Sequence, residues 1–202
     1  MPPRFIAKQL SYPTGFLGYL IGKLMNRHNA KMNAFAIRQL ELTPMDRVLE
    51  IGFGGGVTLP SLIDGTAFIS GVDRSGDMVK RAKVKYAAAV MAGHADFRQG
   101  SVEALPYEAG TFGKIYTANS IYFWSSLDVG FSEIYRVLSP GGRVVIAFLP
   151  KDRMDRMGFP MDIFTSRAPG DVIAALAGAG FKNMRIERPE PATAWNVIVA
   201  TR

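Results

Sequence analysis

The fold of this chain is decided by residues 48–56, which read Val-Leu-Glu-Ile-Gly-Phe-Gly-Gly-Gly. An apolar run contains the acidic residue Glu50 near its end, and glycines then recur as Gly52, Gly54 and Gly56. This pattern predicts a buried parallel strand that breaks into a tight turn, with a helix opening at residues 56–58. Glycine suits such a turn because it adopts positive φ and lets a ligand approach bare backbone.

A second acidic residue, Asp73, ends the next apolar run. It follows Glu50 by about 20 residues, the spacing typical of a βαβ unit that binds a nucleotide. An acid at the end of the second strand is placed to accept hydrogen bonds from both ribose hydroxyls. The glycines alone would also fit a structural turn in another α/β protein. Together with Asp73 they predict a site for a nucleoside cofactor.

The glycine spacing narrows the choice of cofactor. The dinucleotide pattern G-x-G-x-x-G/A needs a small third residue, and counted from Gly52 and Gly54 this residue is Val57. A phosphate-binding G-x-x-x-x-G-K-[ST] is also absent from the sequence. The pattern present is E-x-G-x-G-x-G, from Glu50 to Gly56. It resembles the first motif of class I methyltransferases that use S-adenosylmethionine.

The resemblance extends over residues 47–148. Residues 100–107 are similar to the segment that follows the third strand in that family, and residues 112–119 are similar to its fourth strand. Residues 133–143, Glu-Ile-Tyr-Arg-Val-Leu-Ser-Pro-Gly-Gly-Arg, resemble its E-x-x-R-V-L-x-P-G-G-x turn. In the arrangement of these motifs the chain resembles small-molecule enzymes of the ubiquinone/menaquinone C-methyltransferase type.

Hydrophobic patterning predicts an α/β fold. Strands are expected near Arg47–Ile51, Ala67–Val72, Ala95–Gln99, Lys114–Ala118, Arg143–Phe148, Lys182–Glu187 and Trp195–Ala200, and helices near Gly56–Ile63, Gly76–Met91, Leu127–Leu138 and Pro169–Ala179. This alternation predicts a mostly parallel sheet with helices on both faces. Only four residues, Arg188–Pro191, separate the last two strands, so the final strand is expected to run antiparallel. The result matches the seven-stranded sheet of the family.

Residues 1–40 differ in charge from the rest of the chain. They contain six basic residues and no acidic one, and the whole chain has a net charge of +7. Apolar residues at positions 16–25 surround Gly15, Gly18 and Gly22. Such a segment suits contact with a membrane surface or an anionic ligand, or a helix packed over the cofactor pocket. We expect the second, with an N-terminal helical lid or substrate cap at 1–40 and an S-adenosylmethionine-binding domain at 41–202.

Composition agrees with a cytoplasmic enzyme. Hydrophobic residues make up 48% of the chain, which is ordinary for a globular protein. No apolar run approaches the roughly 20 residues that span a bilayer, and no secretory signal pattern opens the chain. The absence of cysteine excludes disulfides and thiolate metal sites, and no metal is expected. The oligomeric state is not encoded in any feature of the sequence.

The resemblance implies roles for particular residues toward S-adenosylmethionine. Gly52, Gly54 and Gly56 would face its methionine half, and Glu50 would contact its ammonium group directly or through water. Asp73 would hold the ribose and Arg74 would lie near the adenine. The family has an aspartate for the adenine amine where this chain has Ser101, whose hydroxyl can accept one hydrogen bond while the Val102 amide donates another. Asn119, at the end of the fourth strand, completes the set.

No catalytic base can be assigned from the sequence, because the sulfonium is already activated and transfer requires alignment and a dry pocket. The candidates are His28, Tyr12, Tyr19 and Tyr122. The aromatic run at 121–124 and the methionine-rich segment at 149–166 are expected to contact the acceptor or to serve as core packing.

The sequence therefore predicts methyl transfer to a small, partly apolar or aromatic acceptor. Alternatives are an RNA or protein methyltransferase, suggested by the basic N-terminal segment, or a regulatory module that binds the cofactor without turnover. Nucleic acid is not expected, because no RNA-binding appendage is recognisable and Asn119-Ser120-Ile121-Tyr122 lacks the two prolines of base-amine methyltransferases.

Overall fold

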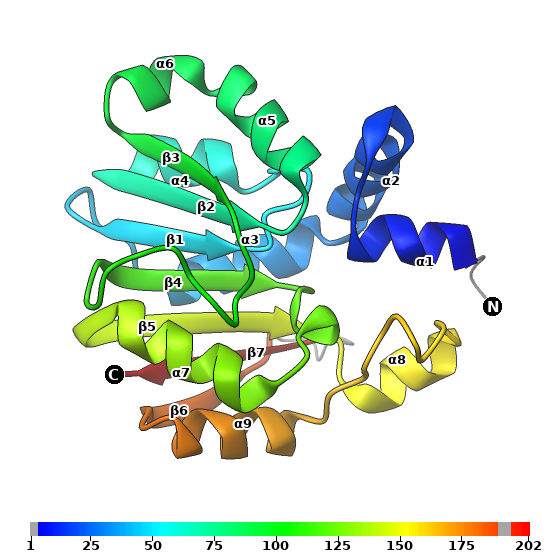
Figure 1. Ribbon diagram of the computed structural model, residues 1–202. Helices are drawn as coiled ribbons and strands as arrows, with labels where there is room; N and C mark the ends of the chain where they lie inside the picture. Colours follow the sequence, from blue (N-terminus) through cyan, green and yellow to red (C-terminus); the bar gives the residue numbers. More distant parts are fainter. Residues whose placement is uncertain (1–3, 190–194) are drawn as a thin grey trace.

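The computed structural model describes residues 4–189 and 195–202, which form an α/β fold (Figure 1). The strands are β1 (Arg47–Ile51), β2 (Phe68–Asp73), β3 (Ala95–Gln99), β4 (Phe112–Ala118), β5 (Leu138–Phe148), β6 (Lys182–Glu187) and β7 (Asn196–Thr201). The helices are α1 (Arg4–Ser11), α2 (Gly15–His28), α3 (Ala30–Gln39), α4 (Leu59–Gly65), α5 (Gly76–Lys85), α6 (Ala87–Met91), α7 (Leu127–Val137), α8 (Lys151–Met157) and α9 (Pro169–Gly178).

All seven strands form one sheet, in the order β3-β2-β1-β4-β5-β7-β6. Strands β1 to β5 pair in parallel, and β7 pairs antiparallel with both β5 and β6. The predicted seven-stranded sheet with an antiparallel last strand is therefore confirmed. Because β1 and β2 are neighbours and parallel, Glu50 and Asp73 both lie toward the carboxyl end of the sheet, where ligands bind in such folds.

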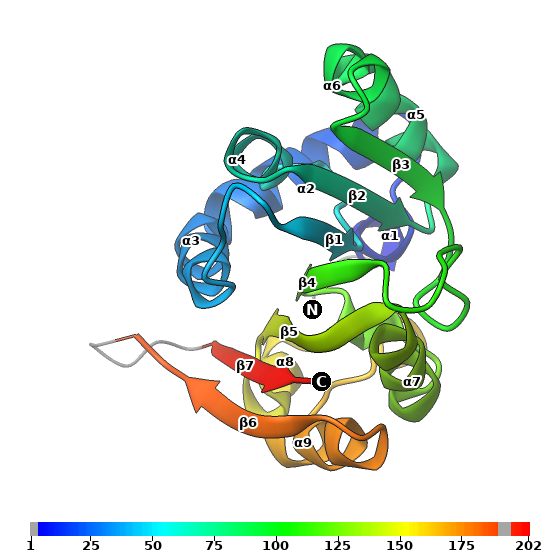
Figure 2. The ribbon, with the colours of Figure 1, turned by 90° about the vertical axis from the view of Figure 1, so that its left-hand side faces the viewer.

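Successive side chains of each strand point to opposite faces of the sheet, and helices cover both faces. Val48 of β1 packs in one buried cluster with α4 and α5, and Val145 of β5 packs with α3. Their sequence neighbours Leu49 and Val144 belong to the cluster that includes α7 and α9. Figure 2 shows α3 and α4 on one side of the sheet and α7 and α9 on the other.

Three local predictions were wrong. The helix expected from Gly56 begins at Leu59, because Gly56 has φ +65° and a helix cannot continue through that conformation. The single helix expected at 76–91 is two helices, because Tyr86 leaves helical geometry with ψ 29°. Helix α8 lies in the segment after β5, for which no helix was expected.

The N-terminal helices divide between two places. Helix α3 packs on the sheet through the buried side chains of Met32, Ala36 and Leu40. Helices α1 and α2 lie beyond the end of the sheet, on the same side as α8 (Figure 1). The segment before α2 is attached to the α5 end, because Ser75 Oγ donates to Pro13 O at 2.5 Å. Within the described residues, no helix combines the length and apolar character that crossing a membrane requires.

Candidate functional site

The turn after β1 is built of glycines in the left-handed conformation. Gly52, Gly54 and Gly56 have φ values of +72°, +50° and +65°, so the predicted positive φ values are confirmed. A Cβ on Gly52 would stand 2.8 Å from Cβ of Ser120. Backbone from the β1 turn and from the segment after β4 therefore approach each other closely, and both line the same pocket.

Glu50 is buried beneath this turn, with 5% of its surface exposed. Thr58 Oγ1 donates to its Oε1 at 2.5 Å, while Oε2 has no hydrogen-bond partner within residues 4–189 and 195–202. Burial raises the pKa of Glu50 to about 7, opposed by the Thr58 hydrogen bond and reinforced by the charge of Asp73. A buried carboxylate oxygen without a partner is costly, and Glu50 lines the same pocket as Asp73 and the glycine turn.

Asp73 shapes the same turn. Its Oδ2 accepts from Gly54 N at 2.8 Å and its Oδ1 accepts from Ser75 N at 2.8 Å. Burial raises the pKa of Asp73, although both amide bonds oppose that effect. Each carboxylate oxygen has a further lone pair, so Asp73 can hold the turn and still accept hydroxyl groups from a ligand.

At the end of β3 the structure adds a residue that the sequence did not indicate. Ser101 Oγ donates to Oε2 of Glu103, so its hydrogen is engaged and only its lone pairs are available to a ligand. Ser125 N also donates to Glu103, at 2.8 Å. Burial alone would raise the pKa of Glu103, but the hydrogen bonds from Ser101 and Ser125 lower it below the usual value. Glu103 thus brings an ionised carboxylate into the pocket beside Ser101 and the buried Val102.

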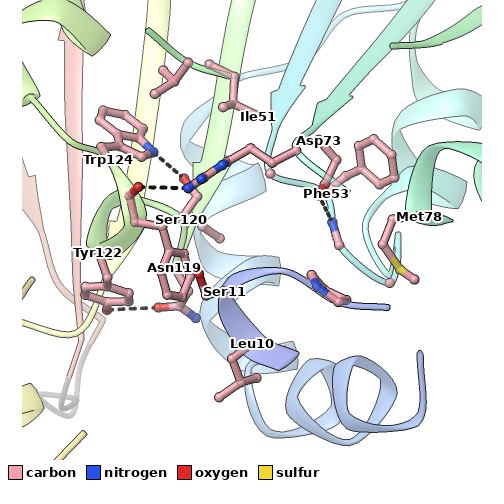
Figure 3. A pocket seen from close by; sticks show the side chains of 18 of the residues that line it. Leu10, Ser11, Ile51, Phe53, Asp73, Met78, Asn119, Ser120, Tyr122 and Trp124 are labelled. Carbon is pink, nitrogen blue, oxygen red and sulfur yellow. Dashed lines mark hydrogen bonds between the residues drawn. The ribbon is translucent and has the colours of Figure 1, made fainter. Parts of the chain in front are cut away.

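The segment after β4 is held by a hydrogen-bonded network around Tyr122 (Figure 3). Leu149 N donates to the Tyr122 hydroxyl at 2.6 Å, and this hydroxyl lies 3.1 Å from the acceptor Oδ1 of Asn119. Asn119 has φ +54°, a conformation that non-glycine residues rarely adopt. Burial raises the pKa of the Tyr122 hydroxyl, so it stays protonated at neutral pH.

Aromatic and sulfur-containing side chains form one wall of the pocket. The rings of Phe159 and Phe164 stack at 4.4 Å between centroids, and Phe123 meets Phe164 edge-on at 4.7 Å. Met154 and Met157 of α8 line the pocket beside them. Phe123 comes from the aromatic run at 121–124 and the other four side chains come from the segment at 149–166, both of which the sequence indicated as acceptor contact or core packing.

Helix α1 supplies the facing wall. Gln9, Leu10 and Ser11 line the same pocket as Glu50 and Asp73, and Figure 3 shows Leu10 and Ser11 facing it from α1. Arg4 of α1 also makes a salt bridge to Asp162, 2.5 Å between nitrogen and oxygen. The pocket therefore lies between the sheet, α1 and the segment that follows α8.

The remaining candidates lie at or outside the mouth of the pocket. Arg74 lines the pocket and donates to Phe123 O at 3.2 Å. Tyr12 is 43% exposed and lines a second hollow at the mouth. Tyr19 lies on α2, with Arg81 stacked 5.2 Å from its ring centroid. The side chain of His28 lies outside the described residues.

The donors and acceptors of the pocket suit a nucleoside that carries a positive charge. The unpartnered Glu50 Oε2 offers an acceptor for a cationic group, Asp73 offers lone pairs for ribose hydroxyls, and the glycine turn offers bare backbone. Among the described side chains that line the pocket there is no histidine and no lysine.

Comparison with known proteins agrees with this geometry. The methyltransferase domain family matches residues 49–146. The uncharacterized methyltransferase YdaC of Bacillus subtilis is 31% identical over 135 residues, which cover 66% of this chain and 72% of YdaC. The ubiquinone/menaquinone biosynthesis C-methyltransferase UbiE of Geotalea daltonii is 34% identical over 115 residues, which cover 55% of this chain and 49% of UbiE.

A solved structure of geranyl diphosphate methyltransferase, in complex with GPP and sinefungin, superposes with a TM-score of 0.74. It is 17% identical, and the match covers 91% of this chain and 80% of the other. At this identity the likeness concerns the fold.

Proposed function

Because the chain belongs to the methyltransferase domain family and is a class I S-adenosylmethionine-dependent methyltransferase, we propose that it methylates a small, apolar or aromatic acceptor. Transfer would proceed by in-line displacement. The observation that carries the proposal is the wall of Phe123, Phe159, Phe164, Met154 and Met157, which lies in the same pocket as Glu50 and Asp73. Such a wall favours an acceptor that gains by leaving water.

S-adenosylmethionine supplies a methyl group already activated by its positively charged sulfur. In our proposal Glu50 binds the ammonium group through its free Oε2, and Asp73 accepts the ribose hydroxyls while it fixes Gly54. Both carboxylates are buried, so little water competes for them. Gly52, Gly54 and Gly56 contribute backbone, as the resemblance implies.

The adenine end would be bound by a pair of side chains. We assign the acceptor of the adenine amine to Ser101 together with Glu103, and Val102 contributes its backbone amide. A hydroxyl that donates to a carboxylate becomes a better acceptor, because hydrogen bonds in a chain polarise one another. Arg74 would cover this end from the mouth, and Asn119 lies where the fourth strand meets the pocket.

Tyr122 is best explained as a positioning residue. Its hydroxyl accepts from Leu149 N and has acceptors in Asn119 Oδ1 and Leu149 O, at 3.1 Å and 3.2 Å. A hydroxyl engaged in this way, with its pKa raised, is poorly suited to remove a proton. Alignment and exclusion of water are the contributions that we expect from the protein, and α1 and α8 supply them.

Two of the similar proteins support an acceptor of this kind by what their names state. One is a C-methyltransferase of ubiquinone/menaquinone biosynthesis, and the other methylates geranyl diphosphate. The chain spans about half the length of the first. For the present chain a related acceptor is part of the proposal.

The test is methyl-labelled S-adenosylmethionine incubated with fractionated metabolite extracts, followed by identification of the labelled product. We expect label in a small apolar or aromatic compound, and Phe159→Leu with Phe164→Leu should raise its KM about tenfold or more while the cofactor dissociation constant changes little. Phe181→Leu is the control, because this buried ring packs against Tyr135, remote from the pocket. Label in RNA or protein, or cofactor binding without any consumption, would refute the proposal in favour of the two alternatives.

A further inference from the structure

The outer face of α2 carries an apolar stripe of three side chains that are exposed to solvent. Phe16, Leu20 and Leu24 are 68%, 42% and 69% exposed. They are spaced by four residues, so they follow one another along one face of the helix. Single exposed apolar residues are ordinary, but a contiguous set of this kind marks an interaction site. We call these three residues the α2 stripe.

The packing of α2 explains why the α2 stripe faces outward. Gly18 is buried, and a Cβ there would stand 2.5 Å from Oε1 of Gln9 and 3.0 Å from the carbonyl carbon of Pro13. Its lack of a side chain lets α2 approach α1 and the α1–α2 connection closely. In Figure 1, α2 lies at the periphery, beyond the end of the sheet. The helix thus packs through Gly18, and the exposed Phe16, Leu20 and Leu24 lie on its opposite side.

Basic side chains predominate around the stripe, although Asp77 Oδ2 accepts from Gly15 N at the start of α2. Residues 1–40 contain six basic residues and no acidic one. Lys8 of α1 and Lys31, which follows α2, are exposed, and Arg81 of α5 stacks over Tyr19 of α2. A basic segment beside an apolar helical face complements a lipid surface whose headgroups are negatively charged, since the apolar side chains enter the interface and the bases meet the headgroups.

Other binding partners would fit the α2 stripe and its basic surroundings less well than a lipid surface. A nucleic acid would match the charge but would leave Leu20 and Leu24 in water, because leucine offers no ring on which a base can stack. A second copy of this chain would bring two basic segments together, and like charges repel. Only a surface that is both anionic and apolar beneath its headgroups satisfies the stripe and the bases together.

We propose that the α2 stripe docks this protein on the surface of an anionic lipid bilayer, without crossing it. Docking would hold α1 near the bilayer, because α1 packs on α2 and also lines the pocket through Gln9 and Leu10. The proposal goes beyond methyl transfer and does not depend on which acceptor is used, since attachment to lipid requires no turnover.

Co-sedimentation with vesicles tests the proposal. The full chain should sediment with vesicles of phosphatidylglycerol and phosphatidylcholine in equal parts, and hardly at all with pure phosphatidylcholine. The variant Phe16→Ser, Leu20→Ser, Leu24→Ser should bind the anionic vesicles with an affinity that is lower by at least about tenfold. Its affinity for S-adenosylhomocysteine, measured by calorimetry, should stay near that of the parent and thereby shows that the fold is intact.

The matched control is Met45→Ser with Met91→Ser. Both methionines are 83% exposed, and they precede β1 and β3, at the opposite end of the sheet from α2. This variant should bind anionic vesicles as the parent does. Failure of the parent to bind, or equal binding by the stripe variant, would overturn the proposal. Retention on RNA instead of vesicles, or a dimer that the stripe variant abolishes in sedimentation velocity, would replace it with one of the other occupants.

Discussion

Thr58 donates a hydrogen bond to one oxygen of Glu50 and leaves the other oxygen buried without a partner in the part of the chain that the structure describes. The two residues flank the glycine turn, one at the end of β1 and one immediately before α4. Their contact fixes the direction of the carboxylate, so the free Oε2 stays available to a ligand. The arrangement leaves an unmet hydrogen bond at the position where we propose that the ammonium group of the cofactor binds.

Glu50→Gln should stabilise the ligand-free protein at alkaline pH and weaken cofactor binding. The folded-state pKa of about 7 lies above the ordinary value of 4.5, so the Glu50 contribution to stability is fully present below about pH 4.5 and is lost as pH rises through 7. Each pKa unit corresponds to about 1.4 kcal/mol, which makes the loss roughly 3 kcal/mol by pH 8. Thermal unfolding of the parent should show this decline, and the variant should show a smaller one, which comes from Asp73 because burial raises its pKa as well.

Asp64→Asn is the control for this experiment, because Asp64 is exposed on α4. It should leave the pH dependence unchanged. A parent protein equally stable at pH 5 and pH 8, after correction by this control, would contradict the assignment of Glu50.

Asp73→Asn should weaken S-adenosylmethionine binding at least about tenfold. The substitution removes a charge and one of the two acceptor oxygens, and hydrogen bonds to a charged acceptor are each worth about 1.5–3 kcal/mol. Because Oδ1 and Oδ2 also hold Ser75 N and Gly54 N, thermal stability should fall as well. Calorimetry well below the melting temperature separates the two effects, and an unchanged dissociation constant would remove Asp73 from the ribose site.

The pocket should prefer S-adenosylmethionine and S-adenosylhomocysteine to NAD by about a hundredfold or more. A dinucleotide needs a small residue at the third position of its glycine motif, and Val57 occupies that position. The left-handed Gly56 immediately before it also delays the start of α4 to Leu59, so the turn differs from one that leads directly into a helix. Competitive calorimetry measures the ratio. Equal or tighter NAD binding would be incompatible with this interpretation.

Deletion of residues 1–28 should reduce methyl transfer roughly a hundredfold or more and weaken cofactor binding much less. The deletion removes α1 and α2 but keeps α3, which packs on the sheet. Gln9 and Leu10 then no longer close the pocket, and loss of alignment and of a dry pocket costs rate more than binding. Single-turnover rates and calorimetry give the two quantities.

Two exposed basic residues in the N-terminal helices provide a control for this deletion. Lys8→Glu with Lys31→Glu should leave the rate on a dissolved neutral acceptor nearly unchanged, because neither side chain lines the main pocket. A fully active deletion variant would refute the proposal that residues 1–28 act as a lid over the pocket. A charge-reversed variant that lost all activity would indicate that the acceptor itself is anionic.

The regular part of the fold could be predicted because it depends on local patterns. β1 and β2 are apolar runs with an acid at or near their end, and only a short connection links β6 and β7. The mostly parallel sheet and the antiparallel last strand therefore followed from hydrophobicity and chain length. The helix start at Leu59 was missed because it depends on the backbone conformation of Gly56, which composition alone does not determine. Helix α8 had available signals: Lys151–Asp155 and Asp152–Arg156 salt bridges at i,i+4 spacing, and Gly158 in the left-handed conformation at its end.

The role of Glu103 could not be predicted, for a different reason. Its orientation depends on Ser125, which is distant in sequence and belongs to the segment after β4. A contact between two loops is set by the packing of the strands that carry them, and no periodicity records it. Ser101, which the sequence did identify, acquires its geometry only through this carboxylate.

The close approach of Gly52 and Ser120 also constrains how this protein can change by mutation. Any side chain at position 52 would have to adopt φ +72° and would meet Ser120 Cβ at 2.8 Å. Only Ser120→Gly would remove the collision, since every other residue keeps a Cβ, and it would leave the backbone penalty, so no single compensating change restores the turn. Descendants of this sequence can therefore alter the wall formed by Phe123, Phe159 and Phe164 step by step, whereas position 52 is inherited as glycine or the pocket is lost.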